Sequence, residues 1–313
     1  MTAADVPAAT ARVVAIISAF NPSSTLVDAC RSVVGQVAGV VVVDDASTEK
    51  AQDHFEACRA LGCEVESLET NSGIAAALNR GLERARALPS PPEFILTLDQ
   101  DSVLQPDYVR RAIDAFESAR AAGLEVGAVA PYSVEGLPSR VDKQVGGVVL
   151  GVEPIQSGLL IPMSVIDEVG PFREELFIDA VDTEFFMRLR DSGLAVVLAP
   201  GTLLAHALGS RYSPTLFGRP VRFRGRSVSI VRSSTFRYYY IARNRVVLNR
   251  LFGARYRRWA VRETLLDLRH VIIVLCLVPG RMRHLRLVVA GWKAGVRGQG
   301  GRMPASVERI LHR

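Results

Sequence analysis

Short strand-like segments alternate with segments of helical spacing over the first hundred residues, and this alternation constrains the fold more than any other feature. Segments 13–17, 40–43, 64–68 and 94–98 have the composition of short strands. Between them, the apolar residues of 24–37 recur at helical spacing, 49–61 resembles a helix, and 74–87 has the Ala-, Leu- and Arg-rich composition of one. Strands that alternate with helices favour an α/β sheet with parallel strands.

A short polar loop follows each of the expected strands. The loops contain Phe20-Asn21, Asp44-Asp45, Asn71 to Gly73 and Asp99 to Asp101. In open α/β sheets, ligands bind beyond the carboxyl ends of the strands. We therefore expect these four loops to share one ligand.

The segment Phe94–Asp101 ends in two carboxylates, Asp99 and Asp101, separated by Gln100. Carboxylates at a buried strand end are costly unless a positive charge pairs with them. A divalent cation held by carboxylates and substrate phosphates meets that need. In the alternative interpretation, Asp99 starts a turn and Asp101 caps the next helix.

Two common phosphate-binding signatures are missing from the sequence. There is no G-x-x-x-x-G-K-[ST] segment, and no G-x-G-x-x-G follows the first strand. P-loop kinases and dinucleotide oxidoreductases are therefore disfavoured. An aspartate at a strand end can instead accept hydrogen bonds from a base or a ribose.

The next hundred residues continue the α/β pattern less regularly. We expect helices at 106–122 and 164–169, strands at 126–130, 156–161 and 195–198, a loop at 132–144 and a turn at Pro200-Gly201. Asp179, Asp182 and Glu184 open a further helical segment; acidic residues at such a position also simply complement the helix dipole. His206 follows the last strand, and a single histidine has a structural interpretation as well as a ligand one.

Composition separates the C-terminal region from the rest. Lys and Arg number 38 against 32 Asp and Glu, the pI is about 9.4, and Arg dominates from Arg211 onward. We expect helices at 236–251, 256–278 and 282–296. The apolar run 271–279 is too short to span a bilayer, which takes about 20 residues.

Three interpretations of this basic region compete. Nucleic-acid binding fits its basic and aromatic composition, but no recognised module accompanies it. A solvated basic face packed on the rest of the chain is the second. We favour the third, an interfacial helix at 271–278 flanked by arginines, beside anionic lipid.

The cysteines and the N-terminus bear on location. Cys30, Cys58, Cys63 and Cys276 form no C-x-x-C pair, so we expect reduced core thiols. The first ten residues have neither the basic nor the apolar region of a signal peptide. We expect a cytoplasmic protein, peripheral on the inner face of the cell membrane.

Taken together, these pieces resemble the inverting family 2 glycosyltransferases of the GT-A fold. The resemblance covers about residues 12–210 and rests on the ordered set of strand-end loops, the acidic residues after Gly170-Pro-Phe172, and His206. Within the family, Asp99-Gln-Asp101 and the segment Leu176 to Asp182 are most similar to rhamnosyltransferases that use dTDP-L-rhamnose. Tyr240-x-x-Arg243-Asn244 fits the same subgroup.

The resemblance implies roles for individual residues. Phe20, Asn21, Asp44, Asn71, Gly73, Asp99 and Gln100 would form the nucleotide-sugar site, with Asp44 at the base and Asp99 near the ribose and diphosphate. Asp101 and His206 would bind Mg²⁺ or Mn²⁺. Asp182 aligns with the catalytic base of the family, whereas Val181 replaces the Glu that usually precedes it. Asp179 is the alternative base.

The sequence thus predicts a GT-A α/β domain at 12–215, with nucleotide-binding (12–101) and acceptor (102–215) halves, followed by a helical, Arg-rich, membrane-associating region at 216–313. The expected activity is rhamnosyl transfer from dTDP-L-rhamnose to a glycan or polyprenyl-linked glycolipid in cell-envelope polysaccharide synthesis. Transfer from UDP-galactofuranose or another UDP-sugar, and a catalytically silent membrane-associated binding protein, are the alternatives. We expect no nucleic-acid partner, and a homo-oligomer stays open.

Overall fold

The computed structural model describes residues 12–135, 137, 140–206, 211–213, 215–216, 219–220, 222–223, 226–227, 230–231 and 233–312. The chain divides into two compact units. Met1–Glu174 and Val181–Ala207 form the N-terminal unit, and Glu175–Ala180 and Leu208–Arg313 form the C-terminal unit. Each unit is described by itself below.

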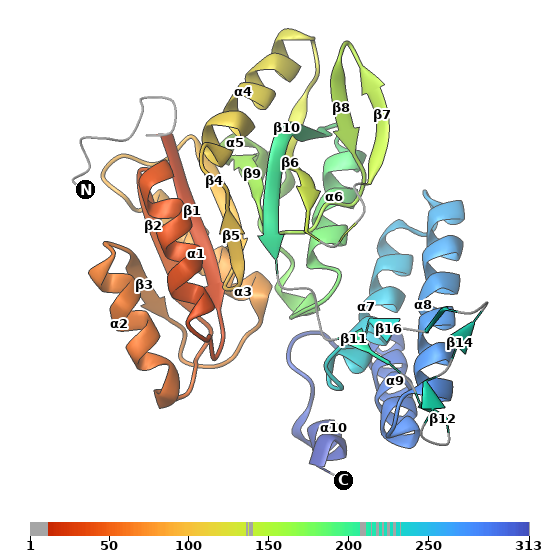
Figure 1. Cartoon of the computed structure of the whole chain (residues 1–313). Helices are drawn as coiled ribbons and strands as arrows, with labels where there is room; N and C mark the ends of the chain where they lie inside the picture. Colours follow the sequence, from red (N-terminus) through yellow and green to blue (C-terminus); the bar gives the residue numbers. More distant parts are fainter. Residues whose placement is uncertain are drawn as a thin grey trace. The chain divides into compact units, whose positions relative to one another are not determined.

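A ten-stranded mixed sheet is the centre of the N-terminal unit (Figure 1). The strand order is β3-β2-β1-β4-β9-β6-β10-β8-β7, and β5 pairs with β10. The strands are β1 (Val13–Ala19), β2 (Gly39–Asp44), β3 (Glu64–Ser67), β4 (Phe94–Asp99), β5 (Ser102–Leu104), β6 (Val126–Val134), β7 (Val141–Val145), β8 (Val148–Gly151), β9 (Leu159–Pro162) and β10 (Ala195–His206). Because β1 to β4 are mutually parallel, their carboxyl ends meet at one edge of the sheet.

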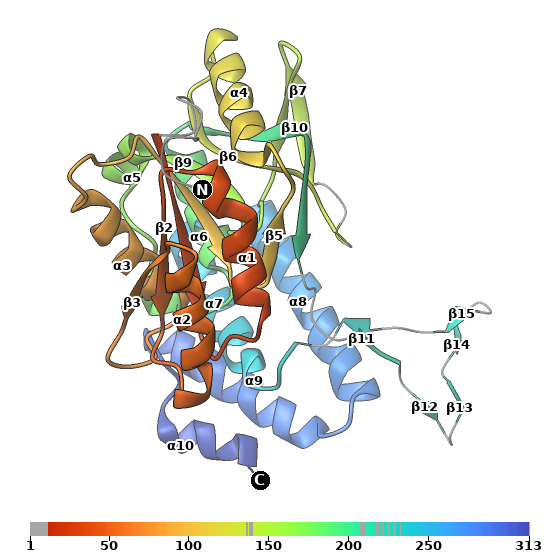
Figure 2. The same ribbon diagram turned by 60° about the vertical axis from the view of Figure 1, so that its left-hand side comes forward.

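Helices cover both faces of this sheet. Side chains of α1 (Thr25–Val33), α2 (Gln52–Ala60) and α4 (Tyr108–Ala121) share one apolar core with alternate residues of β1. The intervening residue Val14 packs with α3 (Ile74–Arg86) on the opposite face, and Figure 2 shows α1 and α3 on opposite sides of β1 and β2. The remaining helices of this unit are α5 (Met163–Val169), α6 (Val181–Asp191) and the short 3₁₀ turns η3 (Val34–Gln36) and η4 (Glu49–Ala51); η5 (Glu174–Leu176) runs into the C-terminal unit.

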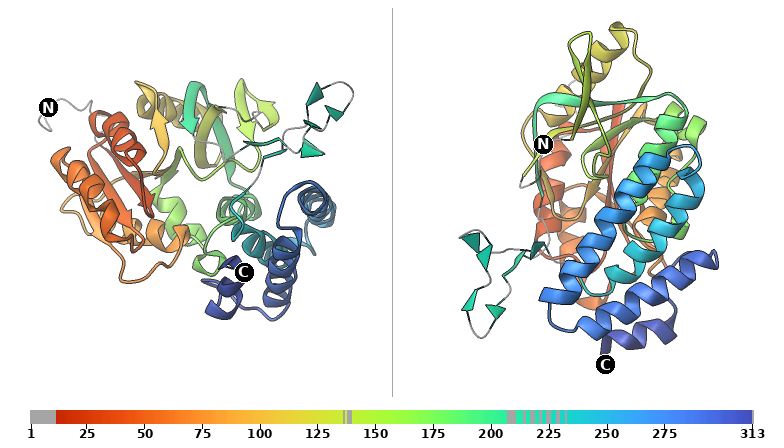
Figure 3. Two further views of the ribbon diagram at one scale, coloured as in Figure 1. Left: turned by 60° about the horizontal axis from the view of Figure 1, so that its bottom comes forward. Right: turned by 90° about the vertical axis from the view of Figure 1, so that its right-hand side faces the viewer.

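The C-terminal unit is built on α7 (Arg237–Phe252), α8 (Arg257–Leu277) and α9 (Arg281–Val296), which lie side by side in the cyan to blue part of Figure 3. Gly291 and Gly295 allow α9 to approach α7 closely, since a Cβ at Gly291 would lie 2.0 Å from the carbonyl oxygen of Tyr239. Two-residue strands make three small ladders before α7, and α10 (Ala305–Glu308) and η6 (Arg309–His312) follow α9. These strands are β11 (Arg211–Tyr212), β12 (Thr215–Leu216), β13 (Arg219–Pro220), β14 (Arg222–Phe223), β15 (Arg226–Ser227) and β16 (Ile230–Val231).

The expected α/β fold with a helical C-terminal region is confirmed, but part of the predicted loop at 132–144 is wrong. β6 continues to Val134, and β7 pairs with β8 as an antiparallel hairpin. The residues of β7 are almost all exposed, so they lack the apolar alternation by which a half-buried strand is recognised.

The predicted turn at Pro200-Gly201 is also wrong, because β10 runs through it to His206. A register shift between Ala199 and Leu203 absorbs these residues as an irregularity within the strand. The Thr202 hydroxyl donates to the carbonyl oxygen of Ala199 (2.7 Å), and the Gln105 amide donates to that of Gly201 (2.8 Å). Side chains therefore satisfy backbone groups that the sheet leaves open.

The prediction for the cysteines is correct for three of the four. Cys30, Cys58 and Cys63 are buried free thiols, whereas Cys276 is exposed on α8. The apolar run around Cys276 lies on a helix with two faces, since Val274 and Val278 are buried in the core whereas Ile272 and Cys276 are exposed.

Candidate functional site

The loop after β1 is tied to the loop after β2 through Asn21. Its backbone N–H donates to the hydroxyl of Ser47 (2.7 Å), and its Oδ1 accepts from the backbone N–H of Thr48 (2.9 Å). Asn21 has a φ of +45°, a conformation that Asn adopts more readily than most residues. The predicted site residue Asn21 thus fixes one wall of the strand-end edge.

Gln100 joins the ends of β1 and β4. Its Oε1 accepts the backbone N–H of Phe20 at 2.7 Å. The Phe20 side chain is 44% exposed, so this ring is available to a flat ligand such as a nucleobase.

Asp44 is the last residue of β2 and Asp45 follows it, and their carboxylates bind different loops. Asp44 is buried, and its Oδ1 accepts the backbone N–H of Ser47 at 2.8 Å. Asp45, also buried, accepts the backbone N–H groups of Ser72 (2.6 Å) and Gly73 (2.8 Å) on its two oxygens. The Asp45 carboxylate therefore organises the loop before α3, a role that the sequence interpretation missed.

That loop carries two predicted site residues, Asn71 and Gly73. Gly73 has a φ of +95°, which favours glycine, and it immediately precedes the first turn of α3. The Oδ1 atom of Asn71 is buried and has no hydrogen-bond partner among the described residues. A buried acceptor without a hydrogen-bond donor is rare in a folded protein, and it indicates that a ligand or a water molecule supplies the missing hydrogen bond.

The short strand β5, which follows β4, pairs with the end of β10. The backbone N–H of Asp99 donates to the Ser157 hydroxyl (3.0 Å), which donates to the hydroxyl of Ser102 (2.7 Å). β5 pairs antiparallel with β10, so that His206 is directly opposite Ser102 in the ladder. His206 is thus brought within one residue of Asp101 in backbone register, while its side chain lies outside the described residues.

Asp101 and His206 fit a divalent cation in donor chemistry. Carboxylate oxygen and imidazole nitrogen are ligands that Mn²⁺ accepts, and two protein ligands leave coordination positions for a diphosphate. No three His, Cys, Asp or Glu side chains within the described part of the chain are grouped to hold a metal ion. The pairing of β5 with β10 is therefore the observation on which the fit rests.

The two carboxylates proposed as bases lie in different units. Asp182 is in the first turn of α6, and its Oδ1 accepts the backbone N–H of Thr183 at 2.7 Å. Asp179 belongs to the C-terminal unit. Both of its oxygens accept from the Arg237 guanidinium, at 3.0 and 3.1 Å from Nε.

Glu184, the third member of the acidic cluster, has a structural task. It is buried and accepts from Nε of Arg173 (3.2 Å) and of Arg188 (3.0 Å). Arg188 also donates to the carbonyl oxygens of Gly170 (2.9 Å) and Pro171 (2.8 Å). Glu184 therefore stabilises the turn before the cluster.

The sequence interpretation also missed the residues that precede β9. Ser157 connects Asp99 to Ser102, as described above. The side-chain amide of Gln156 is buried, and neither its oxygen nor its nitrogen has a hydrogen-bond partner among the described residues. The only signal in the sequence was a Gln-Ser pair at the start of a predicted strand.

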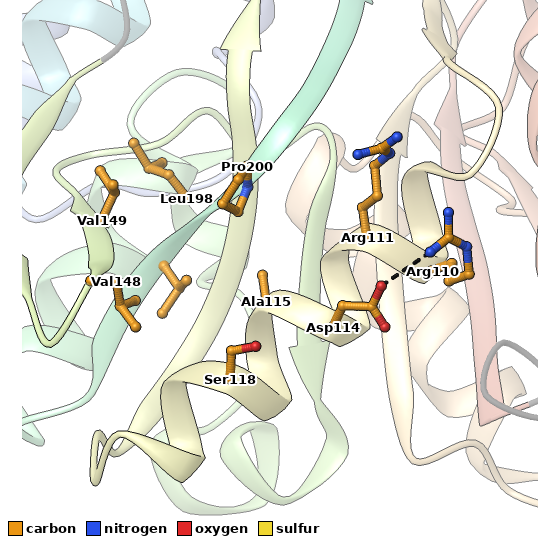
Figure 4. Close-up of a pocket in the computed structure, with 11 residues that line it drawn as sticks. Arg110, Arg111, Asp114, Ala115, Ser118, Val148, Val149, Leu198 and Pro200 are labelled. Carbon is orange, nitrogen blue, oxygen red and sulfur yellow. Dashed lines mark hydrogen bonds and ion pairs between the residues drawn. The ribbon is translucent and has the colours of Figure 1, made fainter.

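A pocket of about 380 Å³ lies elsewhere in the N-terminal unit, between α4 and the strands β8 and β10 (Figure 4). Its polar lining comes from α4, where Asp114 pairs with Arg110. None of the predicted site residues lines it. We therefore assign the candidate site to the strand-end edge and not to this pocket.

Comparison with known proteins agrees with this geometry. Residues 14–157, which contain all four strand-end loops, match the model of the family described as "Glycosyl transferase family 2". This part of the chain is a family 2 glycosyltransferase domain. The chain is also 26% identical over 305 residues to the dTDP-rhamnosyl transferase RfbF of Shigella flexneri, across 93% of this chain and 98% of that protein.

Solved structures of glycosyltransferases share the fold. S. aureus TarS 1-349 in complex with UDP-GlcNAc matches with a TM-score of 0.54 at 17% identity, over 96% of this chain and 83% of that one. The mannosyltransferase PcManGT of Pyrobaculum calidifontis, in complex with GDP-Man and Mn²⁺, matches with a TM-score of 0.51 at 15% identity, over 96% and 79%. The predicted GT-A fold of this glycosyltransferase is thereby confirmed.

Proposed function

We propose that this glycosyltransferase is a metal-dependent, inverting enzyme that transfers L-rhamnose from dTDP-L-rhamnose to a glycan or polyprenyl-linked glycolipid in cell-envelope polysaccharide synthesis. The observation that carries the proposal is the similarity to a dTDP-rhamnosyl transferase over nearly the whole chain, including the Asp99-Gln-Asp101 segment and the region up to Asp182. The catalytic domain would cover 12–215, with the donor bound by 12–101 and the acceptor by 102–215.

The strand-end loops supply the donor site in this proposal. Asp44 contacts the base beside the exposed ring of Phe20. The buried Oδ1 of Asn71 accepts a hydrogen bond from the nucleotide sugar. Asn21, Gln100 and Gly73 shape the loops through the backbone bonds described above. Asp99 lies near the ribose and the diphosphate.

Asp101 and His206 would hold Mg²⁺ or Mn²⁺. When bound, the cation neutralises the negative charge that grows on the leaving nucleoside diphosphate. The Mn²⁺ in the related mannosyltransferase structure supports this assignment.

Asp182 acts as the general base. Its carboxylate takes the proton of the acceptor hydroxyl, whose oxygen forms the new bond to the anomeric carbon. The bond from that carbon to the diphosphate oxygen breaks on the opposite face, and the electron pair leaves with the nucleoside diphosphate. Inversion at the anomeric carbon follows from attack on the far side.

The proposal also places the enzyme at a membrane surface. No helix in the described part of the chain combines the length and the apolar character that a bilayer crossing needs. α8 and α9, however, each expose a row of large apolar side chains at helical spacing, which we call the apolar rows. They are Val261, Leu265, Leu268 and Ile272 on α8, and Met282, Leu285, Val289, Trp292 and Val296 on α9.

The charges beside the apolar rows are basic. α8 and α9 carry seven arginines and one lysine between Arg257 and Val296. The two acidic residues of α8 are engaged, since Glu263 pairs with Arg262 (2.7 Å) and Asp267 with Arg245 (2.6 Å). Apolar rows flanked by cations fit the interface of an anionic bilayer, where an acceptor with a lipid tail is found.

A calorimetric titration tests the donor. We expect dTDP to bind more tightly than UDP, and only in the presence of Mn²⁺ or Mg²⁺. Preference for UDP would favour the galactofuranosyl or another UDP-sugar alternative. Absence of binding to either nucleotide would favour the catalytically silent binding protein.

A further inference from the structure

Residues Glu175–Ala180 leave the N-terminal unit for six residues and join the C-terminal unit. The chain returns at Val181, the first residue of α6, and the proposed base Asp182 follows directly. What holds this segment therefore fixes the point from which the base-bearing helix starts.

Two fully buried side chains of α7, Arg243 and Asn244, bind the backbone of the segment. Nη2 of Arg243 donates to the carbonyl oxygens of Glu175 (2.9 Å) and Leu176 (2.7 Å). Nδ2 of Asn244 lies within hydrogen-bond distance of the carbonyl oxygens of Leu176, Ile178 and Asp179, at 3.0, 2.8 and 2.7 Å.

The two side chains are themselves held in place. Nε of Arg243 donates to Oδ1 of Asn244 (2.9 Å), and Nη1 donates to the carbonyl oxygen of Gly301. Burial lowers the pKa of Arg243, and the rings of Tyr239 and Tyr240 oppose this shift. The guanidinium lies 4.9 Å from the centre of the Tyr240 ring, which compensates part of its lost hydration.

The bound segment adopts a conformation that it would not keep alone. Phe177, Asp179 and Ala180 all have φ near +63°, which is uncommon for residues other than glycine. Such backbone strain persists only where the surroundings determine it, and it concentrates at functional sites. Here the Phe177 ring stacks on Tyr240 at 4.9 Å, and the Asp179 carboxylate is paired with Arg237.

We propose that α7 is a positioning element for catalysis, in which Arg237, Arg243 and Asn244 hold segment 175–180 and thereby set where Asp182 enters the active site. The inference rests on the proposed function, because it takes Asp182 as the base. Asp179 is then a positioning residue, since both of its oxygens already accept hydrogen bonds from Arg237.

The pair Asp179–Arg237 offers the test, because its side chains are less buried than Arg243 and Asn244. We compare Asp179→Asn, Arg237→Gln, the double variant, and the exchanged pair Asp179→Arg/Arg237→Asp. Asp267→Asn is the matched control, since it breaks an Arg–Asp pair of the same unit that binds α7 to α8.

A positioning role predicts equal effects from the two partners. Each single variant should lower kcat by about 10- to 100-fold, the range that a small misplacement of a catalytic group costs. The double variant should be no worse than either single one, and the exchanged pair should recover part of the rate. The KM and the calorimetric affinity for the donor nucleotide should stay unchanged, as should the kcat of Asp267→Asn.

Two results would overturn the inference. If Asp179→Asn abolished turnover while Arg237→Gln kept it, Asp179 would itself be the base. If both variants kept full kcat although hydrogen exchange of the amides 176–182 became faster, the contacts would only tie the segment down. If the unmodified protein did not bind the donor nucleotide, that separate result would count against the proposed function.

Discussion

At the residue scale, several side chains of the candidate site bind backbone groups, and so shape the loops on which a ligand would rest. Asn21, Gln100 and Asp45 each accept backbone N–H groups from a neighbouring loop. Polar residues at strand ends are readily interpreted as ligand contacts, yet the loops have N–H groups of their own that need acceptors. Removing such an acceptor should therefore harm binding and stability together.

Asp45→Ala should lower the free energy of unfolding by about 3 kcal/mol, since it removes two hydrogen bonds to a buried carboxylate. The freed Ser72–Gly73 loop should also weaken dTDP binding. Urea unfolding and calorimetry measure the two effects. The exposed Asp53→Ala on α2 is the control, and a loss of equal size there would show that the loop is not responsible.

Asp182→Asn should reduce kcat by about 10³-fold, because an amide cannot take the proton of the acceptor hydroxyl. The affinity for the donor should change little, since Asp182 belongs to the acceptor side of the proposal. Single-turnover kinetics and calorimetry separate the two quantities. Asp114→Asn, in the pocket of Figure 4, should be silent, and undiminished turnover of Asp182→Asn would place the base elsewhere.

At the element scale, α8 and α9 have two different faces. One face packs within the C-terminal unit, where Val274 and Leu287 are buried in an aromatic core with Tyr238 to Tyr240. The other carries the apolar rows beside arginines. A surface helix normally places its large apolar residues on the packed face only, so the second set needs a partner, which we propose to be anionic lipid.

Leu265→Ser/Ile272→Ser should weaken binding to vesicles containing phosphatidylglycerol by at least about tenfold. A fully embedded Leu or Ile side chain contributes roughly 1.5–3 kcal/mol to binding, and each substitution removes that contribution. Co-flotation measures the binding, and the emission of Trp292 should shift to the blue when vesicles are added. Val141→Ser, at an exposed position of β7, is the control. Dimers in place of vesicle binding would assign the apolar rows to a second copy of the chain.

At the scale of the whole molecule, the chain divides into two units, and we expect the nucleotide-sugar donor to bind within one of them. The proposed donor contacts all belong to the N-terminal unit, whereas α7 to α9 belong to the other.

Truncating the chain from Tyr256 would remove α9 and Gly301 together with the apolar rows. Because Gly301 also accepts from Arg243, membrane attachment is better tested by point substitutions.

Saturating dTDP with Mn²⁺, at about one hundred times the dissociation constant, should stabilise the protein by about 2.7 kcal/mol. Hydrogen exchange should show the added protection at the loops after β1, β2, β3 and β4. Chelating the metal should remove it. Equal protection across α8 would contradict a donor site confined to the N-terminal unit.

Much of the fold follows from local patterns. The alternation up to Phe94, the positions of α7, α8 and α9, and the sharing of one sheet edge by the first four strands are all confirmed. Apolar periodicity reports burial directly, and short loops leave parallel strands little freedom. The β7–β8 hairpin and the extension of β10 were not predictable in this way, because exposed polar strands and a proline-containing irregularity lack that periodicity.

By itself, the sequence determined the chemistry available at the strand ends and the family to which the domain belongs. The tertiary structure decided what each of these carboxylates contacts. It pairs Glu184 with Arg188 and Asp179 with Arg237, and it uses Asp45 to fix a loop. It also assigns segment 175–180 to the C-terminal helices. The physical reason is that the sequence shows the same Asp or Glu whether its carboxylate faces solvent, a guanidinium or a backbone amide. Only long-range packing determines which of these partners the carboxylate has.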